Sequence, residues 1–252
     1  MVRAEMLTDL GLEGRRVLVV GAAQGIGRAT AIWLAELGME VIAADVQDCS
    51  ETVAASKGSV ARRLDLSDPR EIEGLIGELD TDAAPLYAVV NCAGLLLRRP
   101  LDETTAEAIT RQTEVNQYGS FFLARAALAR MQARGQGRIV LYTSQGAFTG
   151  GFHGSIPYAM NKAAVTALVK SMARTAAPHG VTVNAVAPGG IDTAMMRVGL
   201  SAADLEAFRA MIPMGRLGLP EELAGPTAFL LSKWSAYVTG TTIHVNGGQM
   251  ML

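Results

Sequence analysis

Short runs of Val, Ile, Leu and Ala recur along the chain and alternate with stretches in which apolar residues return every three or four positions. Several of the runs are almost continuously apolar, as strands are when both faces of a sheet are covered. We predict strands at 16–20, 40–45, 60–66, 86–91, 138–143, 181–187 and 241–245. Between them, the helical period predicts helices at 25–37, 69–79, 103–133, 157–175 and 220–231.

This alternation indicates a parallel sheet with right-handed crossovers. Seven strands suit one doubly wound α/β sheet, a Rossmann fold, flanked by helices. Because no linker, low-complexity tract or repeat divides the sequence, we expect one domain over residues 1–252. Residues 189–219 follow a strand and contain a short helical pattern at about 201–211, which predicts a lid at the strand ends.

Composition and charge narrow the classes of function. Half of the residues are hydrophobic, which excludes disorder, and the net charge is −2 with Lys and Arg scattered. We therefore expect no nucleic-acid partner and no acidic-membrane surface. No apolar run approaches about 18 residues, so we expect no membrane span.

The start of the chain lacks the apolar core of a signal peptide. Cys49 and Cys92 lie near separate predicted strands, which favours reduced thiols and a cytoplasmic protein. The three His and two Cys residues show no metal-ligand spacing, so we predict no metal site.

The stretch SIPYAMNKAAV places Tyr158 and Lys162 four positions apart, on one face of the predicted helix. One interpretation is an amphipathic helix with an edge tyrosine and a lysine that extends to solvent. The other is a tyrosine whose proton is easier to remove beside an ammonium group. The pair alone leaves both open. Pro157 is expected at the first helical position.

A glycine-rich turn joins the first strand to the first helix, with the spacing G-x-x-x-G-x-G at Gly21, Gly25 and Gly27. Glycines allow backbone N–H groups to approach a pyrophosphate at a helix N-terminus, whose dipole favours anions. A tight turn without a ligand is the alternative interpretation. The strand before the turn and the helix after it favour dinucleotide binding.

Asp45 closes the second predicted strand, 18 positions after Gly27. A carboxylate there accepts both hydroxyls of an adenosine ribose and repels a 2′-phosphate. Neither Gln24 in the turn nor Val46 after the acid supplies a cation for that phosphate. We therefore predict NAD rather than NADP as the cofactor.

Further segments occur in a fixed order along the chain, namely DLSD (65–68), NCAG (91–94), EVNQYGS (114–120), YTSQGAF (142–148) and VNAVAPGGIDTAM (183–195). With the glycine turn and the Tyr158–Lys162 pair, they resemble the short-chain dehydrogenase/reductase family, in its single-domain branch. The resemblance extends from about residue 12 to the end of the chain. It departs from the family pattern at Val20, where Thr is usual, and at Cys92, where Asn is usual.

The resemblance implies hydride transfer between a carbinol carbon and a nicotinamide. It implies that Tyr158 is the acid and base, and that Lys162 and the nicotinamide charge lower the pKa of its phenol. Ser144 is expected to orient the substrate oxygen, and Asn116 to hold a water that connects Lys162 to solvent. Thr193 is expected to bond the carboxamide. The implied cofactor-binding residues are Gly21, Gln24, Gly25, Ile26, Gly27, Asp45, Val46, Asp65, Leu66, Asn91, Ala93, Gly94, Tyr158, Lys162, Pro188, Gly189, Ile191 and Thr193.

Residues that line the substrate pocket in the family are mostly apolar here. They correspond to Leu95, Leu96, Gln145, Phe148, Phe152, His153, Met195, Met196 and Val198. This favours a medium-sized, partly apolar secondary alcohol or ketone over a polyol. His153 either contacts a polar substrate group or is a bystander in its loop.

Three other functions compete with an NAD-dependent alcohol dehydrogenase. A 3-oxoacyl-acyl-carrier-protein reductase has a similar overall pattern, but such enzymes usually prefer NADPH, which Asp45 opposes. A non-catalytic NAD-binding regulator has no need of the four catalytic residues. A sugar-nucleotide epimerase shares Tyr-x-x-x-Lys but needs a larger C-terminal domain. Family members are commonly homotetramers, and the apolar end of the tail suits an interface.

Overall fold

The computed structural model describes residues 9–152 and 154–251 and contains one seven-stranded sheet. All neighbouring strands pair in parallel, in the order β3-β2-β1-β4-β5-β6-β7. The strands are β1 Arg16–Val20, β2 Glu40–Asp45, β3 Val60–Arg63, β4 Leu86–Asn91, β5 Gly137–Tyr142, β6 Val181–Pro188 and β7 Thr242–Val245. The predicted doubly wound parallel α/β fold is confirmed.

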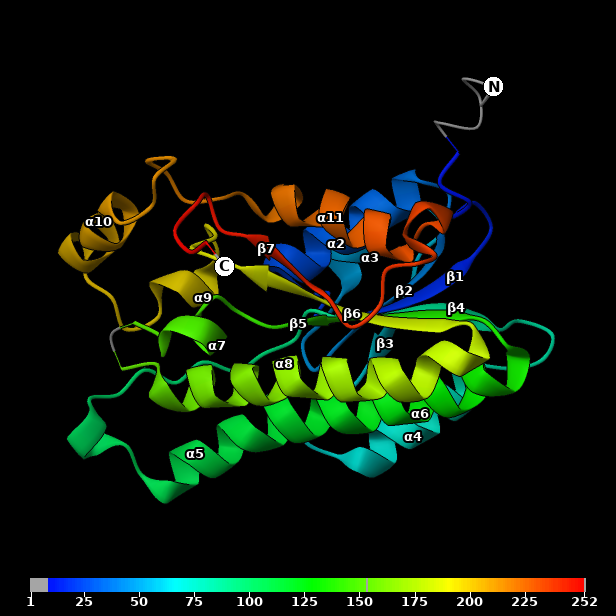
Figure 1. The fold of residues 1–252 in the computed structure, drawn as a ribbon, viewed down its shortest axis with the longest axis horizontal. Helices are drawn as coiled ribbons and strands as arrows, with labels where there is room; N and C mark the ends of the chain where they lie inside the picture. Colours follow the sequence, from blue (N-terminus) through cyan, green and yellow to red (C-terminus); the bar gives the residue numbers. More distant parts are fainter. Residues whose placement is uncertain (1–8, 153, 252) are drawn as a thin grey trace.

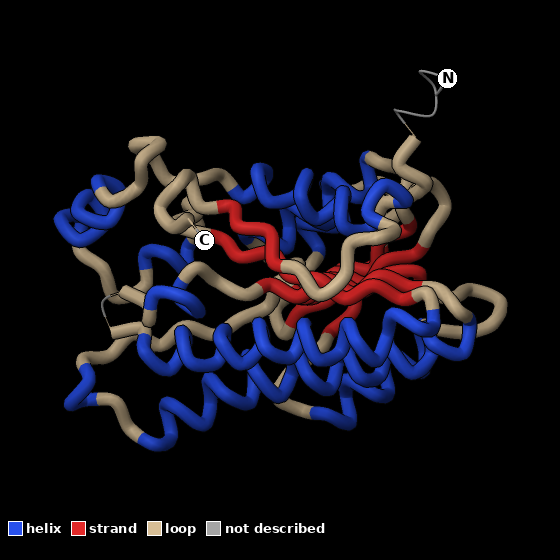
Figure 2. Tube along the Cα trace, in the orientation of Figure 1, coloured by secondary structure: helices blue, strands red, loops and turns tan. Residues whose placement is uncertain are grey.

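The two faces of the sheet are covered by separate layers of helices. Along β1, Val17 and Val19 pack in one core cluster, and Leu18 and Val20 pack in the other. Helices α4 (Pro69–Leu79), α6 (Gly119–Arg134) and α8 (Ile156–Ala176) cover the face of Leu18, and α2 (Gly25–Glu36) and α11 (Ala224–Leu231) cover the face of Val17. Figure 1 shows these helices, and Figure 2 shows the strands between the two layers. Burial on both faces explains why the strands are continuous apolar runs.

The long helix predicted at 103–133 is interrupted in the structure. It consists of a 3-10 turn η1 (Leu101–Glu103), α5 (Ala106–Thr113), a π-helical stretch η2 (Glu114–Tyr118) and α6. Thr105 starts α5, since its hydroxyl accepts a hydrogen bond from the N–H of Ala108 at 3.2 Å. In η2 the carbonyl of Asn116 accepts a hydrogen bond from the Ser120 hydroxyl at 2.6 Å. A π-helical stretch is rare and has no residue pattern of its own, so the sequence does not reveal it.

Other differences from the predicted elements lie at short helices and element ends. The structure adds α3 (Ser50–Ala55), α7 (Gly146–Thr149) and α9 (Ala194–Arg197), which are too short to show a clear period. Helix α8 begins at Ile156, so Pro157 is its second residue rather than its first. Strand β3 ends at Arg63, because the chain turns at Asp65, whose carboxylate accepts from the N–H of Ser67. Short 3-10 turns complete the chain: η3 (Ala177–His179), η4 (Pro220–Leu223) directly before α11, and η5 (Lys233–Ser235).

The insertion at 189–219 leaves the end of β6, and its two ends come back together. The N–H of Gly218 donates to the carbonyl of Gly190 at 2.9 Å, and that of Asp192 donates to the carbonyl of Gly218 at 2.8 Å. The insertion carries α9 and α10 (Ala202–Ala210), which begins with a capping box. Phe208 of α10 is buried, and its ring edge meets the ring of Phe152 with 5.0 Å between centroids. These helices therefore pack beyond the carboxyl end of β6 (Figure 1).

Within residues 9–152 and 154–251, no helix is both long enough and apolar enough to cross a membrane. Over the same ranges, no group of three or more His, Cys, Asp or Glu side chains is placed to hold a metal ion. Cys49 and Cys92 are both free thiols.

Candidate active site

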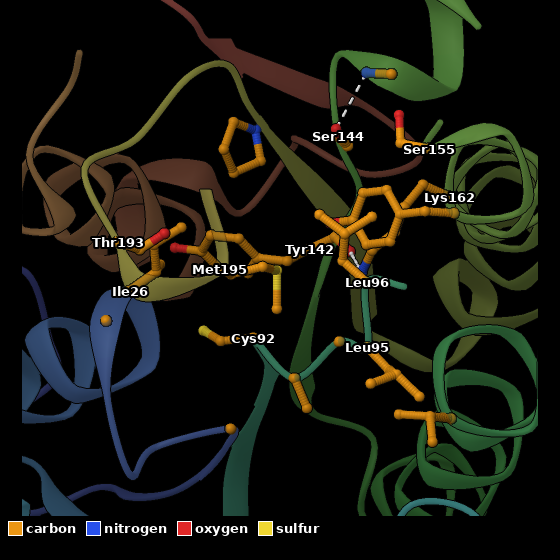
Figure 3. A pocket seen from close by; sticks show the side chains of 18 of the residues that line it. Ile26, Cys92, Leu95, Leu96, Tyr142, Ser144, Ser155, Lys162, Thr193 and Met195 are labelled. Atoms are coloured by element: carbon orange, nitrogen blue, oxygen red, sulfur yellow. Dashed lines mark hydrogen bonds between the residues drawn. The ribbon is translucent and has the colours of Figure 1, made fainter. Parts of the chain in front are cut away.

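A cavity of about 1180 Å³ opens at the carboxyl ends of the central strands. Its wall comes from the turn between β1 and α2, the segments after β2, β3, β4, β5 and β6, helices α5, η2 and the start of α8, the insertion, and Gln249. The strand order reverses between β1 and β4, which is where open α/β sheets bind ligands. In the view of Figure 3, Ser144 and Lys162 lie on one side of the cavity and Ile26 and Thr193 on the other.

The turn after β1 has no space for side chains at two of its glycines. A Cβ atom on Gly21, whose φ is 82°, would lie 2.5 Å from the backbone nitrogen of Ala93. A Cβ atom on Gly27 would lie 2.0 Å from the carbonyl oxygen of Gly21. Helix α2 starts after Gln24, whose side chain makes no capping hydrogen bond, and its first residues line the cavity. An uncapped helix N-terminus behind a closely packed turn fits the pyrophosphate of a dinucleotide.

Asp45 connects the end of β2 to this turn. Its carboxylate accepts hydrogen bonds from the N–H of Ala23 at 3.1 Å and of Gln47 at 3.0 Å, and the residue lines the cavity. Because each carboxylate oxygen has more than one acceptor position, these bonds still allow Asp45 to accept ribose hydroxyls. Sequence reasoning missed Arg28, whose Nε donates to the carbonyl of Ala23 at 3.0 Å and whose Nη2 lies 2.8 Å from a Glu51 carboxylate oxygen.

Most of the other predicted cofactor-binding residues are in the cavity wall. These are Gly21, Gln24, Gly25, Ile26, Gly27, Val46, Asp65, Leu66, Ala93, Gly94, Tyr158, Lys162, Pro188, Gly189, Ile191 and Thr193. Asn91 differs, because it is buried behind the wall. Its amide donates to the hydroxyl of Ser120 at 3.1 Å and accepts from the N–H of Ala93 at 3.1 Å. Asn91 thus supports Ala93 from behind the wall, and a contact between Asn91 and the cofactor stays a prediction.

The fold brings Ser144, Tyr158 and Lys162 into the same wall. The Nζ atom of Lys162 lies 5.5 Å from the centroid of the Tyr158 ring and donates to the carbonyl of Tyr142 at 2.8 Å. The Oγ atom of Ser144 accepts a hydrogen bond from the N–H of Gly146 at 3.0 Å, drawn as a dashed line in Figure 3. That bond does not use the proton of the Ser144 hydroxyl, which can donate to a ligand.

The protein alone does not make the phenol of Tyr158 more acidic. Burial raises the pKa of Tyr158 to about 12, and the positive charge of Arg98 opposes this rise. Burial also lowers the pKa of Lys162 to about 8. Arg98 is thus a cation that sequence reasoning did not include and that acts to lower the pKa of Tyr158, and the effect of Lys162 on the phenol stays a prediction.

Asn116 lies behind the cavity wall rather than in it. It is fully buried in η2 and does not line the cavity. Its amide donates to the carbonyl of Leu95 and accepts from the N–H of Leu95, both at 2.8 Å. The side chain of Asn116 is thus paired with the backbone after β4, and its expected hold on a water stays a prediction. A Cβ atom on Gly94 would lie 3.3 Å from Asn116 Oδ1 and 3.5 Å from Lys162 Nζ, so this backbone passes close to both.

The two departures from the family pattern lie on opposite faces of the sheet. Val20 packs in the core under α4, α6 and α8, whereas Cys92 packs against the core under α2 and α11. The backbone joins them, since the N–H of Cys92 donates to the carbonyl of Val20 at 2.9 Å. Burial raises the pKa of the Cys92 thiol to about 12, so this thiol stays protonated near neutral pH.

Gln145, Phe152 and Met195, whose contact with substrate is a prediction, line the cavity, and His153 lies outside the described residues. Phe148 does not line the cavity, because its ring packs against His244 with 4.9 Å between centroids. Val198 is likewise exposed rather than part of the wall. Leu95, Leu96 and Met196 are in the wall.

Sequence reasoning missed two residues of this side, Gln249 and Arg98. The amide of Gln145 donates to the Gln249 side chain at 2.6 Å across 104 positions, a separation that no local pattern reveals. Arg98 follows three leucines after β4, and its charge could have marked it as an exception in an apolar segment.

Parallel strands wound about a glycine-rich turn, with a Tyr-x-x-x-Lys pair in the same cavity, define an oxidoreductase that uses a nicotinamide cofactor. A family model described as enoyl-(acyl carrier protein) reductase matches residues 21–250. The 3-oxoacyl-[acyl-carrier-protein] reductase of Vibrio cholerae is 38% identical over 248 residues, which cover 96% of this chain and 100% of that protein. The chain belongs to the short-chain dehydrogenase/reductase family.

Sugar dehydrogenases are similar to the chain as well. The L-rhamnose 1-dehydrogenase (NAD(P)(+)) of a Sphingomonas strain is 35% identical over 246 residues, covering 94% of this chain and 96% of that protein. A crystal structure from Agrobacterium tumefaciens with bound NADP, assigned as a 2-deoxy-D-gluconate 3-dehydrogenase, has a TM-score of 0.87 and 34% identity. That match covers 94% of this chain and 97% of the other. These relatives support a nicotinamide cofactor and leave both NAD and NADP open.

Proposed function

We propose that this oxidoreductase interconverts a secondary alcohol and a ketone with NAD, and that Tyr158 exchanges the proton of the alcohol. The observation that carries the proposal is the shared cavity of Ser144, Tyr158, Lys162 and the glycine turn. The apolar wall residues favour a medium-sized, partly apolar substrate.

The cofactor would be held by the chain's own backbone and by a few side chains. The N-terminus of α2 would bind the pyrophosphate, Asp45 the adenosine ribose, Lys162 the nicotinamide ribose, and Thr193 the carboxamide. A bound nicotinamide supplies the hydride acceptor or donor and, when oxidised, a positive charge near the phenol.

Tyr158 needs help to lose its proton, since burial raises its pKa to about 12. The cation of Arg98 acts in the required direction, and a protonated Lys162 would add to it. Because the pKa of Lys162 is lowered to about 8, its charge is present at neutral pH and decreases above pH 8. In our proposal, the phenolate forms only when several positive charges surround it.

Ser144 and Asn116 would have different roles. Ser144 would donate its hydroxyl proton to the substrate oxygen, because its Oγ already accepts from Gly146. Asn116 would act as a positioning residue that fixes the backbone of Leu95, with which its amide makes two hydrogen bonds. Removal of Asn116 should therefore disturb the wall beside Lys162 rather than remove a contact to substrate.

The test is the appearance of NADH absorbance when secondary alcohols are added at alkaline pH. We expect Tyr158→Phe to lower kcat by at least about 1000-fold with little effect on NAD binding, because only the acid and base is removed. Tyr237→Phe is the matched control, since Tyr237 is fully exposed and should change nothing. Unchanged activity in Tyr158→Phe would exclude the proposed mechanism.

A 3-oxoacyl-acyl-carrier-protein reductase is the second candidate function, favoured by the 38% identity to the Vibrio cholerae enzyme. Reduction of a 3-oxoacyl thioester with NADPH, measured beside oxidation of simple alcohols with NAD, distinguishes the two. A thioester reduced at least about 100 times more efficiently than any simple ketone would favour the second candidate.

We also propose that the protein forms a homotetramer. Tyr118, Phe121 and Met160, from η2, α6 and α8, are 52%, 40% and 59% exposed, and Met251 in the tail is 79% exposed. Large apolar side chains on outer helices are typical of subunit contacts. Sedimentation equilibrium tests this, and a monomer at micromolar concentration would contradict it.

A further inference from the structure

Basic side chains of the described residues enter the cavity wall at Arg98, Arg111 and Lys162. Lys162 donates to the carbonyl of Tyr142, and Arg111 is exposed on α5. The acidic wall residues Asp45 and Asp65 belong to the cofactor side, at the ends of β2 and β3, and Glu107 and Glu114 lie on α5 and η2. Arg98 comes directly after the apolar residues Leu95, Leu96 and Leu97, and its charge acts on Tyr158.

Two elements hold Arg98 at this place. One of its terminal nitrogens donates to the carbonyl of Phe152 at 2.8 Å. Its aliphatic stem lies against the insertion, because a Cβ atom on Gly199 would be 3.2 Å from the Cβ of Arg98. The side chain is half-buried, and burial lowers its pKa, although an arginine remains charged at any physiological pH.

The chemistry of this cation points to a ligand group. A guanidinium carries five N–H donors in a planar fork, so it can hold a carbonyl and an anion together. Its fork matches the two oxygens of a carboxylate. A carboxylate is a monoanion and loses less hydration energy in an apolar cavity than a phosphate dianion does.

We propose that Arg98 makes the cavity selective for secondary alcohols and ketones that carry a carboxylate. This inference rests on the proposed function for the reaction, but it concerns recognition by Arg98 and can be tested without turnover. Arg98 is a specificity-determining residue in this proposal. Because Arg98 and Tyr158 line the same cavity, a substrate carboxylate bound by Arg98 would lie in the cavity where the proton is transferred.

Binding is measured first, by saturation-transfer NMR titration of the NAD-loaded protein with hexanoate and hexanamide. We expect hexanoate to bind wild type at least 10-fold more tightly than hexanamide. Arg98→Gln should abolish that difference, and Arg98→Lys should retain part of it, which keeps the test valid if the Gln variant fails to fold. Arg99→Gln is the matched control, because Arg99 is exposed and outside the wall.

Turnover is measured second, with 3-hydroxybutyrate, 4-hydroxypentanoate, their methyl esters and glycerol 3-phosphate. Arg98→Gln should raise the KM of the acids at least 30-fold more than the KM of the esters, whereas a fall in kcat from the lost positive charge near Tyr158 should be the same for acids and esters. An equal change of KM for acids and esters would reduce Arg98 to a structural role, and equal binding of hexanoate and hexanamide to wild type would overturn the proposal. Preference for glycerol 3-phosphate would overturn the choice of carboxylate. If hexanoate binds as expected but no alcohol is oxidised, the proposed function fails and the inference on Arg98 stands.

Discussion

The cofactor half of the cavity is lined closely by backbone atoms, whereas the substrate half is lined by side chains. On the cofactor side, the backbone at Gly21 and Gly27 is packed so closely that a Cβ atom would meet another backbone atom at 2.5 Å or 2.0 Å. On the substrate side, Phe152, Met195 and Arg98 form the wall with side chains. A wall of backbone tolerates almost no substitution, whereas side chains can be exchanged while the fold is kept. The nucleotide site is therefore fixed by the fold, and substrate choice depends on a few replaceable groups.

The largest effect is expected from Gly27→Ala on the cofactor side. The new methyl group would meet the carbonyl oxygen of Gly21 at 2.0 Å, so the turn has to move. We expect NAD binding, measured by calorimetry, to weaken at least 100-fold, and stability to fall by about 3 kcal/mol. Gly74→Ala on α4, where a Cβ atom meets nothing within 4 Å, should bind NAD normally and gain about 0.5–1 kcal/mol. Normal NAD binding by Gly27→Ala would remove the contrast between the two halves.

Lys162→Met tests a buried charge that lies where the cofactor half and the substrate half of the cavity meet. Burial lowers the pKa of Lys162 from 10.5 to about 8, so the folded protein binds fewer protons than the unfolded chain between pH 8 and 10.5. Stability attributable to this group therefore rises with pH across that window, and below pH 8 the buried charge carries its full cost. Removing the charge should stabilise the protein at pH 7 by about 2 kcal/mol, after allowance for the lost bond to Tyr142.

Turnover by Lys162→Met should fall at least about 100-fold, because the cation near Tyr158 is lost. Urea unfolding at pH 7 and pH 10 measures the change in stability, and the stabilising effect should be smaller at pH 10. Lys170→Met, on an exposed position of the same helix, is the control for both measurements. A variant less stable than wild type at pH 7 would show that the lost hydrogen bond outweighs the buried charge.

Asp45→Ala tests the contribution of one side chain in the cofactor half of the cavity. Its carboxylate is expected to accept the ribose hydroxyls and to repel a 2′-phosphate, so the ratio of kcat/KM for NAD over NADP should fall about 10-fold or more. Asp48→Ala, a neighbouring exposed acid outside the cavity wall, should keep the wild-type ratio. A ratio that stays the same in Asp45→Ala would assign cofactor choice to another group, with Arg28 the first candidate because its guanidinium bonds the same turn.

The smallest effect is expected from Met195→Leu on the substrate side. Met195 lines the cavity, and Figure 3 shows it beside Thr193 in this view. Because leucine has nearly the same volume, we expect kcat/KM for a good alcohol substrate to change less than about 3-fold and stability by less than about 1 kcal/mol. A loss of 100-fold would show that the substrate half is as tightly specified as the glycine turn.

Much of the fold follows from two features of the sequence: short apolar runs, which predict strands, and apolar residues that return every three or four positions, which predict helices. The seven strands were predicted within three residues at every end, because burial on both faces makes the central strands apolar runs. Two features of the long helix were not predicted, namely the break at Thr104 and Thr105 and the π-helical stretch at Asn116. Hydrogen bonds of single side chains decide both of them. The same limit applies to α7 and α9, which have only four residues each.

The sequence by itself determined the α/β class, the glycine turn, the position of Asp45 and the pairing of Tyr158 with Lys162 on one helix face. These are local, since each depends on residues within one βαβ unit or one helical turn. Only the tertiary structure decided that Asn116 binds the backbone of Leu95, that Asn91 lies behind the wall, and that Arg98 lies near Tyr158. These depend on burial and on contacts between distant segments, and the field at a buried phenol is the sum of charges that only the folded chain brings together.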